Sequence, residues 1–253
     1  RQTTVPLLVS DWLGKLLPRV NTADQTDRLL ALPPDEREGF IDMMHYKGSL
    51  EFTRRLDQWL DKFEEQLPPQ DALKFGPFTL FTPEQARAFL VEGEKPFPFA
   101  TRIERFKKEL TQRAKDAAKK VNTWLEAETQ RRANALHALP DSPQRRERLF
   151  KLYQSRDQRL KETNERVRPF VDEAMKAFPT LRPIELYRAF LTDLLSESEP
   201  DSPAWDTAEY TLKRIGSRIE PEDVAPIALI ALRAHPLERM DIRHIVIDEA
   251  QDF

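Results

Sequence analysis

The chain has 253 residues, of which 40% are hydrophobic and 33% are charged. No apolar run approaches the roughly 20 residues that a membrane-spanning helix needs, and the N-terminus lacks the basic stretch and apolar core of a secretory signal. Cysteine is absent, which excludes disulfide bonds, thiol catalysis and cysteine-ligated zinc. We therefore expect a cytoplasmic protein that makes no contact with a membrane.

Residues 1–100 contain short helical patterns that prolines separate. The expected helices cover residues 4–17, 24–32, 35–44 and 49–67. Residues 74–82 are rich in Phe and Thr, which favours a β-strand. Thr82 and Pro83 then supply the cap and the first-turn proline of another helix. We predict a helical base with one short strand.

The longest periodic segment covers residues 101–139, where apolar residues recur at steps of three or four. A reversal follows at residues 140–143, and residues 144–168 repeat the pattern. This spacing predicts two long helices that pack antiparallel as a hairpin. Pro169 kinks or restarts the second helix, so we expect the whole hairpin, which we call the arm, to cover residues 101–178.

Residues 179–240 return to shorter helices. We expect helices at 183–195, 205–215 and 221–234, and the last of these should be buried because it is apolar almost all round. Residues 242–247 are rich in β-branched side chains and precede carboxylates, which predicts a central parallel strand within the final segment, 241–253. The expected fold class is therefore mainly α, a helical domain with a long antiparallel hairpin, plus a terminal strand of an α/β domain.

Charge is unevenly distributed along the chain. Residues 102–168 carry 19 basic and 10 acidic residues, whereas the rest of the chain carries 21 basic and 33 acidic residues. This excess suits the arm to an acidic partner, although a solvated coiled coil with internal i,i+4 ion pairs is the alternative. We predict that arginines near the reversal bind a partner and do not serve stability. They are Arg131, Arg132, Arg145, Arg146 and Arg148.

The tryptophans and histidines do not indicate a ligand site. All four tryptophans fall on apolar faces, so we expect Trp12, Trp59, Trp124 and Trp205 to pack in the core. The four histidines are scattered along the chain and lack carboxylates at metal-binding spacing. We therefore expect no metal site built from histidine.

The end of the chain carries the chemistry. Only six glycines are present, and none forms the phosphate-binding patterns GxGxxG or GxxxxGK[ST]. Asp248 and Glu249 directly follow the expected strand, and α/β sheets bind ligands at the carboxyl ends of their strands. In nucleotide hydrolysis Asp248 would hold Mg²⁺ and Glu249 would orient or deprotonate the attacking water. The alternative is an acidic helix N-terminus that the helix dipole favours.

The string from His244 to Phe253, apolar residues and then Asp-Glu-Ala-Gln-Asp, resembles motif II, the Walker B box, of superfamily 1 helicases of the UvrD/Rep type. The resemblance implies that Asp248 binds Mg²⁺ and that Glu249 is the catalytic base. It also implies that Gln251 and Asp252 couple the nucleotide to other motifs. Glu249 and Gln251 would then be catalytic, and Asp248 and Asp252 would bind the cofactor, ATP with Mg²⁺.

A looser likeness to the HelD-type group, relatives of helicase IV that associate with bacterial RNA polymerase, covers most of the chain. It is carried by residues 1–4, 11–13, 47–52, 78–82, the basic arm and 185–188. It implies that the chain is the segment between motifs Ia and II, an insertion into the first RecA-like domain. Residues 241–253 would then supply a strand of that domain. We expect a piece of a longer protein, because the chain starts without Met and stops in mid-pattern. The remaining RecA-like domains would complete the ATP site, and the piece alone would hold no cofactor and would not be active.

Three functions remain open from the sequence. The first is an insertion of a HelD-type ATPase, whose arm contacts RNA polymerase or nucleic acid bound to it. The second is part of a DNA-translocating helicase, whose basic face tracks phosphates and whose binding falls steeply with salt. The third is a helical interaction module without catalysis.

Overall fold

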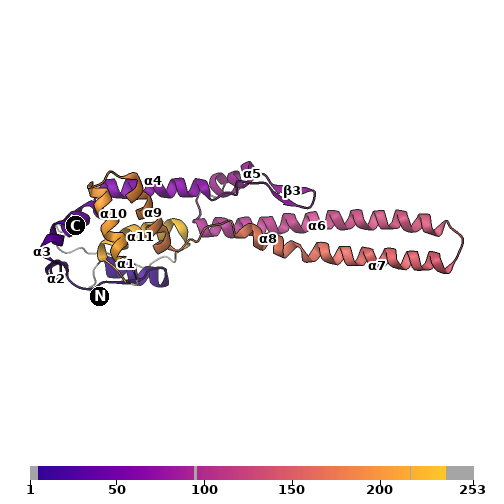
Figure 1. Ribbon diagram of the computed structural model, residues 1–253, viewed down its shortest axis with the longest axis horizontal. Coiled ribbons are helices and arrows are strands. Elements are labelled where there is room, and N and C mark those ends of the chain that lie inside the picture. The colour runs from indigo at the N-terminus through magenta and orange to yellow at the C-terminus, as the bar shows by residue number, and fades with distance from the viewer. Residues whose placement is uncertain (1–4, 94–95, 217, 238–253) are drawn as a thin grey trace. The chain divides into compact units, whose positions relative to one another are not determined.

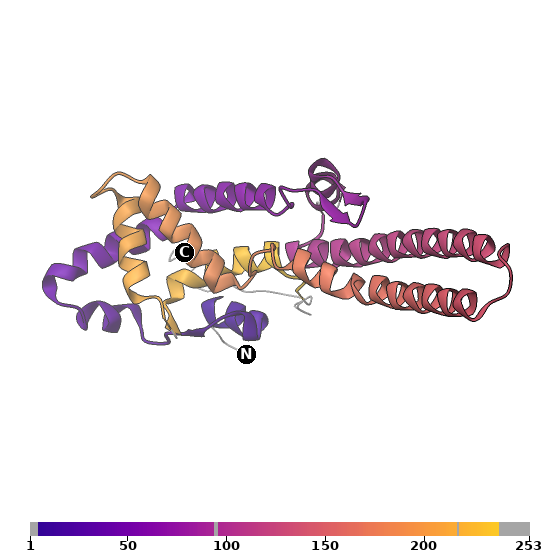
Figure 2. The same cartoon turned by 45° about the vertical axis from the view of Figure 1, so that its right-hand side comes forward.

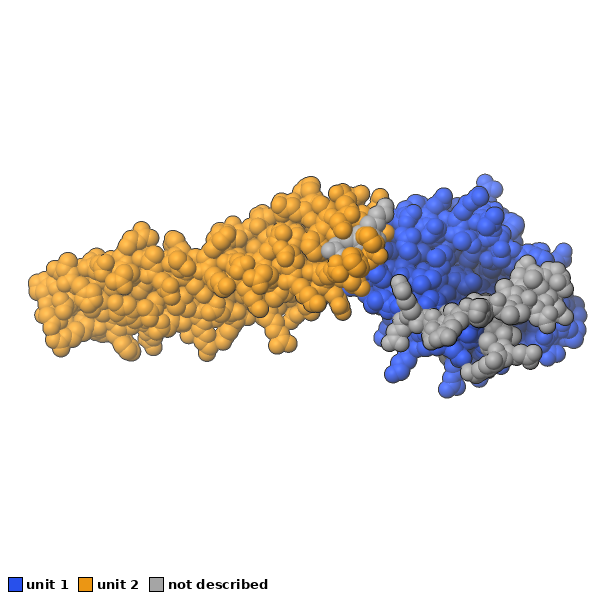
Figure 3. Space-filling view, turned by 180° about the vertical axis from the view of Figure 1, so that it is seen from behind, with its two compact units in different colours: residues 1–62, 98–100, 180–253 blue, residues 63–97, 101–179 orange. Residues whose placement is uncertain are grey.

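The computed structural model describes residues 5–93, 96–216 and 218–237, and it is mainly helical, which confirms the predicted fold class (Figures 1 and 2). The chain divides into two compact units, which Figure 3 colours separately. Unit 1 comprises residues 1–62, 98–100 and 180–253, and unit 2 comprises residues 63–97 and 101–179. The strand predicted at 242–247 lies outside the described residues.

Local signals set the helix ends of unit 1. Proline stands in the first turn of α3, α9, α10 and α11, where its fixed φ suits a helix and its missing N–H is not needed. Ser202 caps α10 by accepting a hydrogen bond from the Trp205 N–H at 3.3 Å. The helices that lie wholly or mainly in unit 1 are α1 (Val5–Leu13), η1 (Gly14–Leu16), α2 (Gln25–Leu30), α3 (Pro34–Lys47), α4 (Leu50–Gln66), α9 (Pro183–Glu197), α10 (Pro203–Arg214) and α11 (Pro221–Ala234).

Helix α11 is central to the packing of unit 1. It contacts α1, α3 and α9, and α10 packs against both α9 and α3. Val224, Ile227 and Ile230 of α11 are buried, as its apolar sequence predicted. A short parallel ladder joins β1 (Arg19–Val20) to β4 (Arg218–Ile219) in the same unit.

Unit 2 contains a small β-hairpin where we predicted one strand over 74–82. The strands β2 (Leu73–Phe75) and β3 (Phe78–Phe81) pair antiparallel. The single-strand prediction was wrong because Gly76 adopts a φ of +58°, which reverses the chain and which residues with a side chain rarely adopt. The cap at Thr82 is confirmed, since its hydroxyl accepts from the Gln85 N–H at 3.3 Å and opens α5 (Pro83–Arg87), which η2 (Ala88–Gly93) follows.

The predicted long hairpin is confirmed. Helix α6 (Phe99–His137) and helix α7 (Pro143–Glu165) run side by side and antiparallel in both views (Figures 1 and 2). Asn122 on α6 donates a hydrogen bond to Asn164 on α7 at 2.9 Å, which fixes their register. Helix α8 (Val167–Met175) follows after a break at Arg166, three residues before Pro169. The break lies there because proline lacks an N–H and its ring clashes with the carbonyl four residues earlier.

The core of unit 2 lies at the end of the hairpin away from the reversal. Phe81 of β3 and Phe106 of α6 pack with their ring centroids 4.7 Å apart, and Val167 and Ile103 belong to the same apolar cluster. The Arg102 guanidinium donates to the Glu64 carboxylate at 2.6 Å, and both side chains are buried. These contacts group residues 63–97, part of the predicted base, with the arm.

None of the four tryptophans is fully buried, and Trp124 departs furthest from the expected core position. Trp124 is 59% exposed, so its prediction as a core residue was wrong. In this part of the hairpin α6 is covered by α7 alone, and the residues that are buried, Leu125, Thr129 and Ala133, form a stripe with a spacing of four. Trp124 lies beside that stripe.

Among the described residues, no helix is both long and apolar enough to cross a membrane.

Candidate functional site

The predicted ATPase residues Asp248, Glu249, Gln251 and Asp252 all lie outside the described residues. Within the part of the chain that the structure describes, no group of three or more His, Asp or Glu side chains is placed to hold a metal ion. The candidate site that can be built from geometry is therefore the distal half of the hairpin, which we define as residues 126–160.

The distal hairpin exposes most of its side chains. Helix α7 contains no buried residue along its whole length, and Phe150 on this helix is 67% exposed. On α6, only Thr129 and Ala133 are buried within the distal half. Burial of apolar surface is the main source of folding stability, so this half contributes little to the core of unit 2. Its surface is available for contacts with another molecule.

A network around Asp141 fixes the reversal. Ser142 caps α7 by accepting from the Arg145 N–H at 3.2 Å. Arg145 donates to the Leu139 carbonyl and to the Asp141 carboxylate, each at 2.7 Å. Arg146 also donates to Asp141, and this hydrogen bond, with help from the charge of Arg145, lowers the pKa of the Asp141 carboxyl below its ordinary value. The reversal is therefore held by side chains.

The five predicted partner-binding arginines all lie in the distal hairpin, in different settings. Arg131 and Arg132 both pair with Glu128, at 2.9 and 2.7 Å. Arg145 is half-buried, and its side chain donates to the Leu139 carbonyl and the Asp141 carboxylate at the reversal, contacts that the sequence did not predict. Arg148 is exposed, and it makes no hydrogen bond or ion pair with the described residues.

Positive charge remains after these internal contacts. Residues 128–152 contain six basic and three acidic side chains. Every one of those acidic side chains is already engaged: Glu128 and Asp141 each bind two arginines, and Glu147 binds Lys151 at 2.6 Å. Three positive charges are therefore uncompensated. Exposed ion pairs add little stability, so this arrangement mainly sets the electrostatic character of the surface.

A groove lies between α6 and α7 in the distal hairpin, and we did not predict it from the sequence. Its volume is about 510 Å³. Ala135, Leu136 and Leu152 form its apolar floor, and Arg132, Arg148 and Lys151 form its basic rim. The available signal was Ala135, whose small side chain leaves a hollow beside the larger leucines.

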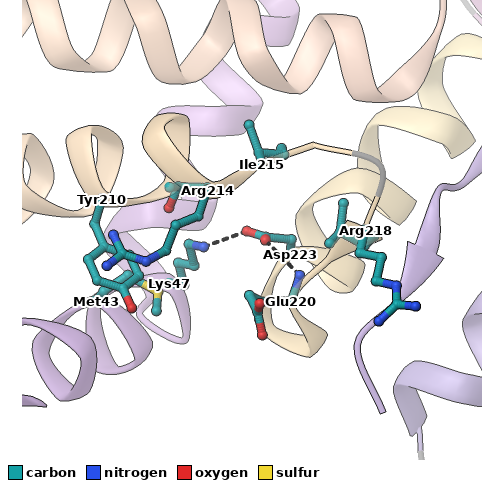
Figure 4. A pocket seen from close by; sticks show the side chains of 10 residues that line it. Met43, Lys47, Tyr210, Arg214, Ile215, Arg218, Glu220 and Asp223 are labelled. Carbon is teal, nitrogen blue, oxygen red and sulfur yellow. Dashed lines mark hydrogen bonds and ion pairs between the residues drawn. The ribbon is translucent and has the colours of Figure 1, made fainter. Parts of the chain in front are cut away.

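A buried polar cluster in unit 1 was also missed. The Lys47 ammonium donates to Asp223, which also accepts from the Glu220 N–H at 3.2 Å (Figure 4) and from the Tyr187 hydroxyl at 2.8 Å. Burial, and then the charge of Asp223, raise the pKa of Tyr187 well above its ordinary value. The adjoining cavity has a volume of about 10 Å³, which holds one water molecule at most. The cluster can stabilise unit 1, but it cannot bind a substrate.

The chain was compared with protein families, with curated proteins and with solved structures, and it matches none of them. The hairpin geometry and the motif at the end of the sequence therefore carry the functional argument.

Proposed function

We propose that the chain is part of a cytoplasmic ATP-hydrolysing helicase or translocase of the UvrD/Rep type, HelD-like group, and that its hairpin is a protein-contacting arm. The proposed partner of the arm is RNA polymerase. The observation that carries the proposal is the distal hairpin, a long pair of helices in which α7 buries no residue. The distal hairpin adds little to the core of unit 2, and its exposed side chains are best explained by contacts with another molecule.

The charges of the distal hairpin favour a protein partner over nucleic acid at this end. Four of the five arginines are engaged by Glu128 or Asp141, and only Arg148 has no partner among the described residues. A phosphate-binding surface gains its affinity from cations that are free to replace counterions. The groove floor is aliphatic, and aliphatic floors occur in protein interfaces.

The catalytic part of the proposal rests on the sequence of motif II. Asp248 would hold Mg²⁺ and Asp252 would contact the ATP-binding motifs. Glu249 would act as the base toward the attacking water, with Gln251 coupling the nucleotide to the other motifs. Hydrolysis also needs a phosphate-binding loop, and the glycines of this chain do not form one. The activity would therefore belong to the assembled RecA-like domains and not to this chain alone.

A crosslinking experiment tests the arm. A photoreactive phenylalanine replaces Leu139, which is 48% exposed at the reversal, and purified RNA polymerase is added. The proposal predicts a crosslink to a polymerase subunit. The matched control places the same group at Leu30 in unit 1, which is 62% exposed, and predicts none. Equal crosslinking from both positions, or none from Leu139, would contradict the proposal.

A second candidate, binding of a nucleic-acid backbone, is favoured by a different surface. Lys107, Lys108 and Lys115 are exposed along one face of α6, and their side chains make no hydrogen bond or ion pair within the described chain. Replacing all three with Gln would weaken binding to DNA and would reduce its salt dependence. If the triple variant binds DNA as the parent does, with the same salt slope, this candidate fails.

A further inference from the structure

The groove of the distal hairpin differs from the rest of the arm because it combines an aliphatic floor with a basic rim. Leu136 and Leu152 are half-buried and come from opposite helices, and Ala135 is an exposed residue of α6 whose small side chain leaves space beside them. Arg148 at the rim is exposed, and it is not engaged by any acidic residue in the described chain.

We propose that this groove binds an acidic amphipathic helix of a partner protein, with aliphatic anchors on the floor and carboxylates at the rim. The inference rests on the proposed protein-contacting role of the arm and names the chemistry of its partner. Two antiparallel helices with an apolar groove between them offer the surface on which a third helix packs in bundles and in helix-in-groove complexes.

Charge complementarity selects the acidic form of that helix. The three uncompensated positive charges in residues 128–152 would oppose a basic helix and attract an acidic one. Arg148 is the best placed of them because a partner carboxylate meets no competing acidic side chain there. Arg132 and Lys151 keep their own acidic partners, Glu128 and Glu147, and form the edges of the groove.

The aliphatic floor of the groove is unsuited to nucleic acid. Binding of single strands relies on aromatic side chains that stack with bases, and no aromatic side chain lines this groove. Phosphate and sugar offer no apolar surface that would cover Ala135, Leu136 and Leu152. An amphipathic helix offers both the aliphatic face and the carboxylates.

The test uses the whole chain and a fluorescent peptide of about 18 residues, or five helical turns. Its sequence places Leu on one helical face and Glu on the others. A scrambled peptide of the same composition and a single-stranded oligonucleotide of the same charge serve as competing probes. Binding is measured by fluorescence anisotropy at low and high salt.

Two variants address the two halves of the site. Ala135→Phe fills the hollow without changing charge, and we expect it to weaken binding of the amphipathic peptide by at least about tenfold. Its matched control is Ala127→Phe, an exposed position on the same helix outside the groove, which should have no effect. Arg148→Glu should weaken binding mainly at low salt, whereas Lys119→Glu, at an exposed position of α6 outside the groove, should not.

Several results would overturn the inference. They are equal binding of the scrambled peptide, no effect of Ala135→Phe, or binding of the oligonucleotide that Ala135→Phe abolishes. The last would make nucleic acid the occupant. The proposed function is tested separately. If the peptide binds as expected while Leu139 gives no crosslink to RNA polymerase, the groove is a helix-binding site but RNA polymerase is not the partner of the arm. If the crosslink forms and Ala135→Phe changes nothing, the arm contacts RNA polymerase but the groove is not the binding site.

Discussion

Asp141 accepts a hydrogen bond from Arg145 at 2.7 Å, and the two residues close the reversal between α6 and α7. Arg145 also donates to the Leu139 carbonyl at 2.7 Å, so one guanidinium ties both sides of the turn. An arginine that looked like a free binding residue in the sequence is therefore also part of the fold.

Arg145→Glu should loosen the reversal without unfolding unit 2. The change places a carboxylate beside Asp141 and removes both hydrogen bonds. Because α7 buries no residue, the thermal midpoint should stay nearly the same. Amide hydrogen exchange of residues 138–146 should become several-fold faster. Arg148→Glu, which breaks no side-chain hydrogen bond or ion pair in the described chain, is the control, and equal exchange in the two variants would disprove the role of Arg145.

The buried cluster of unit 1 should tolerate the loss of one partner poorly. Asp223→Ala leaves the Lys47 ammonium buried without its carboxylate, and such changes cost about 3–5 kcal/mol in the free energy of unfolding. Tyr187→Phe removes one hydrogen bond and should cost about 1 kcal/mol. Both values come from urea unfolding followed by circular dichroism.

The double variant Lys47→Met/Asp223→Leu separates charge from packing in this cluster. Replacing both charges by apolar side chains of similar size should restore much of the stability that Asp223→Ala loses. If the double variant is as unstable as the single one, the ion pair itself stabilises unit 1, and our account of the cost as an unpaired buried charge is wrong.

Unit 1 should lose stability at alkaline pH. Burial and the neighbouring Glu51 raise the pKa of Tyr46 to about 12, against an ordinary value near 10. A raised pKa in the folded state gives stability that is complete below about pH 10 and is lost as pH rises toward about 12. Tyr46→Phe should make this part of the pH profile of urea unfolding less steep without removing the slope, because the raised pKa of Tyr187 contributes as well. Equal profiles for the parent and Tyr46→Phe would contradict the prediction.

Glu249→Gln tests the motif at the end of the chain, in a full-length protein that also carries a phosphate-binding loop. The amide keeps the shape of the side chain but cannot accept a proton from water. ATP turnover should fall at least about a hundredfold, which is the usual scale of general-base catalysis, while ATP remains bound. Turnover close to that of the parent would rule out the proposed role of Glu249.

Local signals made much of the fold predictable. Proline and serine at the reversal, Ser142 and Pro143, placed the ends of the two long helices within a few residues of their observed bounds. The apolar sequence of α11 predicted its burial. These features depend on neighbours in the chain, which a sequence displays directly.

The features that were missed depend on residues far apart in the chain. Lys47 is buried with its ammonium against Asp223, which also accepts from Tyr187, and no local pattern at the end of α3 indicates this. The groove required the register of α6 against α7, which the Asn122–Asn164 contact fixes. At Gly76 the sequence did carry the turn signal, but the surrounding Phe and Thr residues favoured one continuous strand.

The most direct test of the central claim is the affinity of RNA polymerase for a chain with a shortened arm. Residues 126–160 are replaced by a short Gly-Ser turn that joins Leu125 to Lys161. Every residue of the apolar cluster of unit 2 lies outside this range, so urea unfolding should confirm an intact core. Our account predicts that the parent chain binds the polymerase and that the shortened chain binds at least about tenfold more weakly. Equal affinity of the two chains would contradict the assignment of the distal hairpin as the protein-contacting surface.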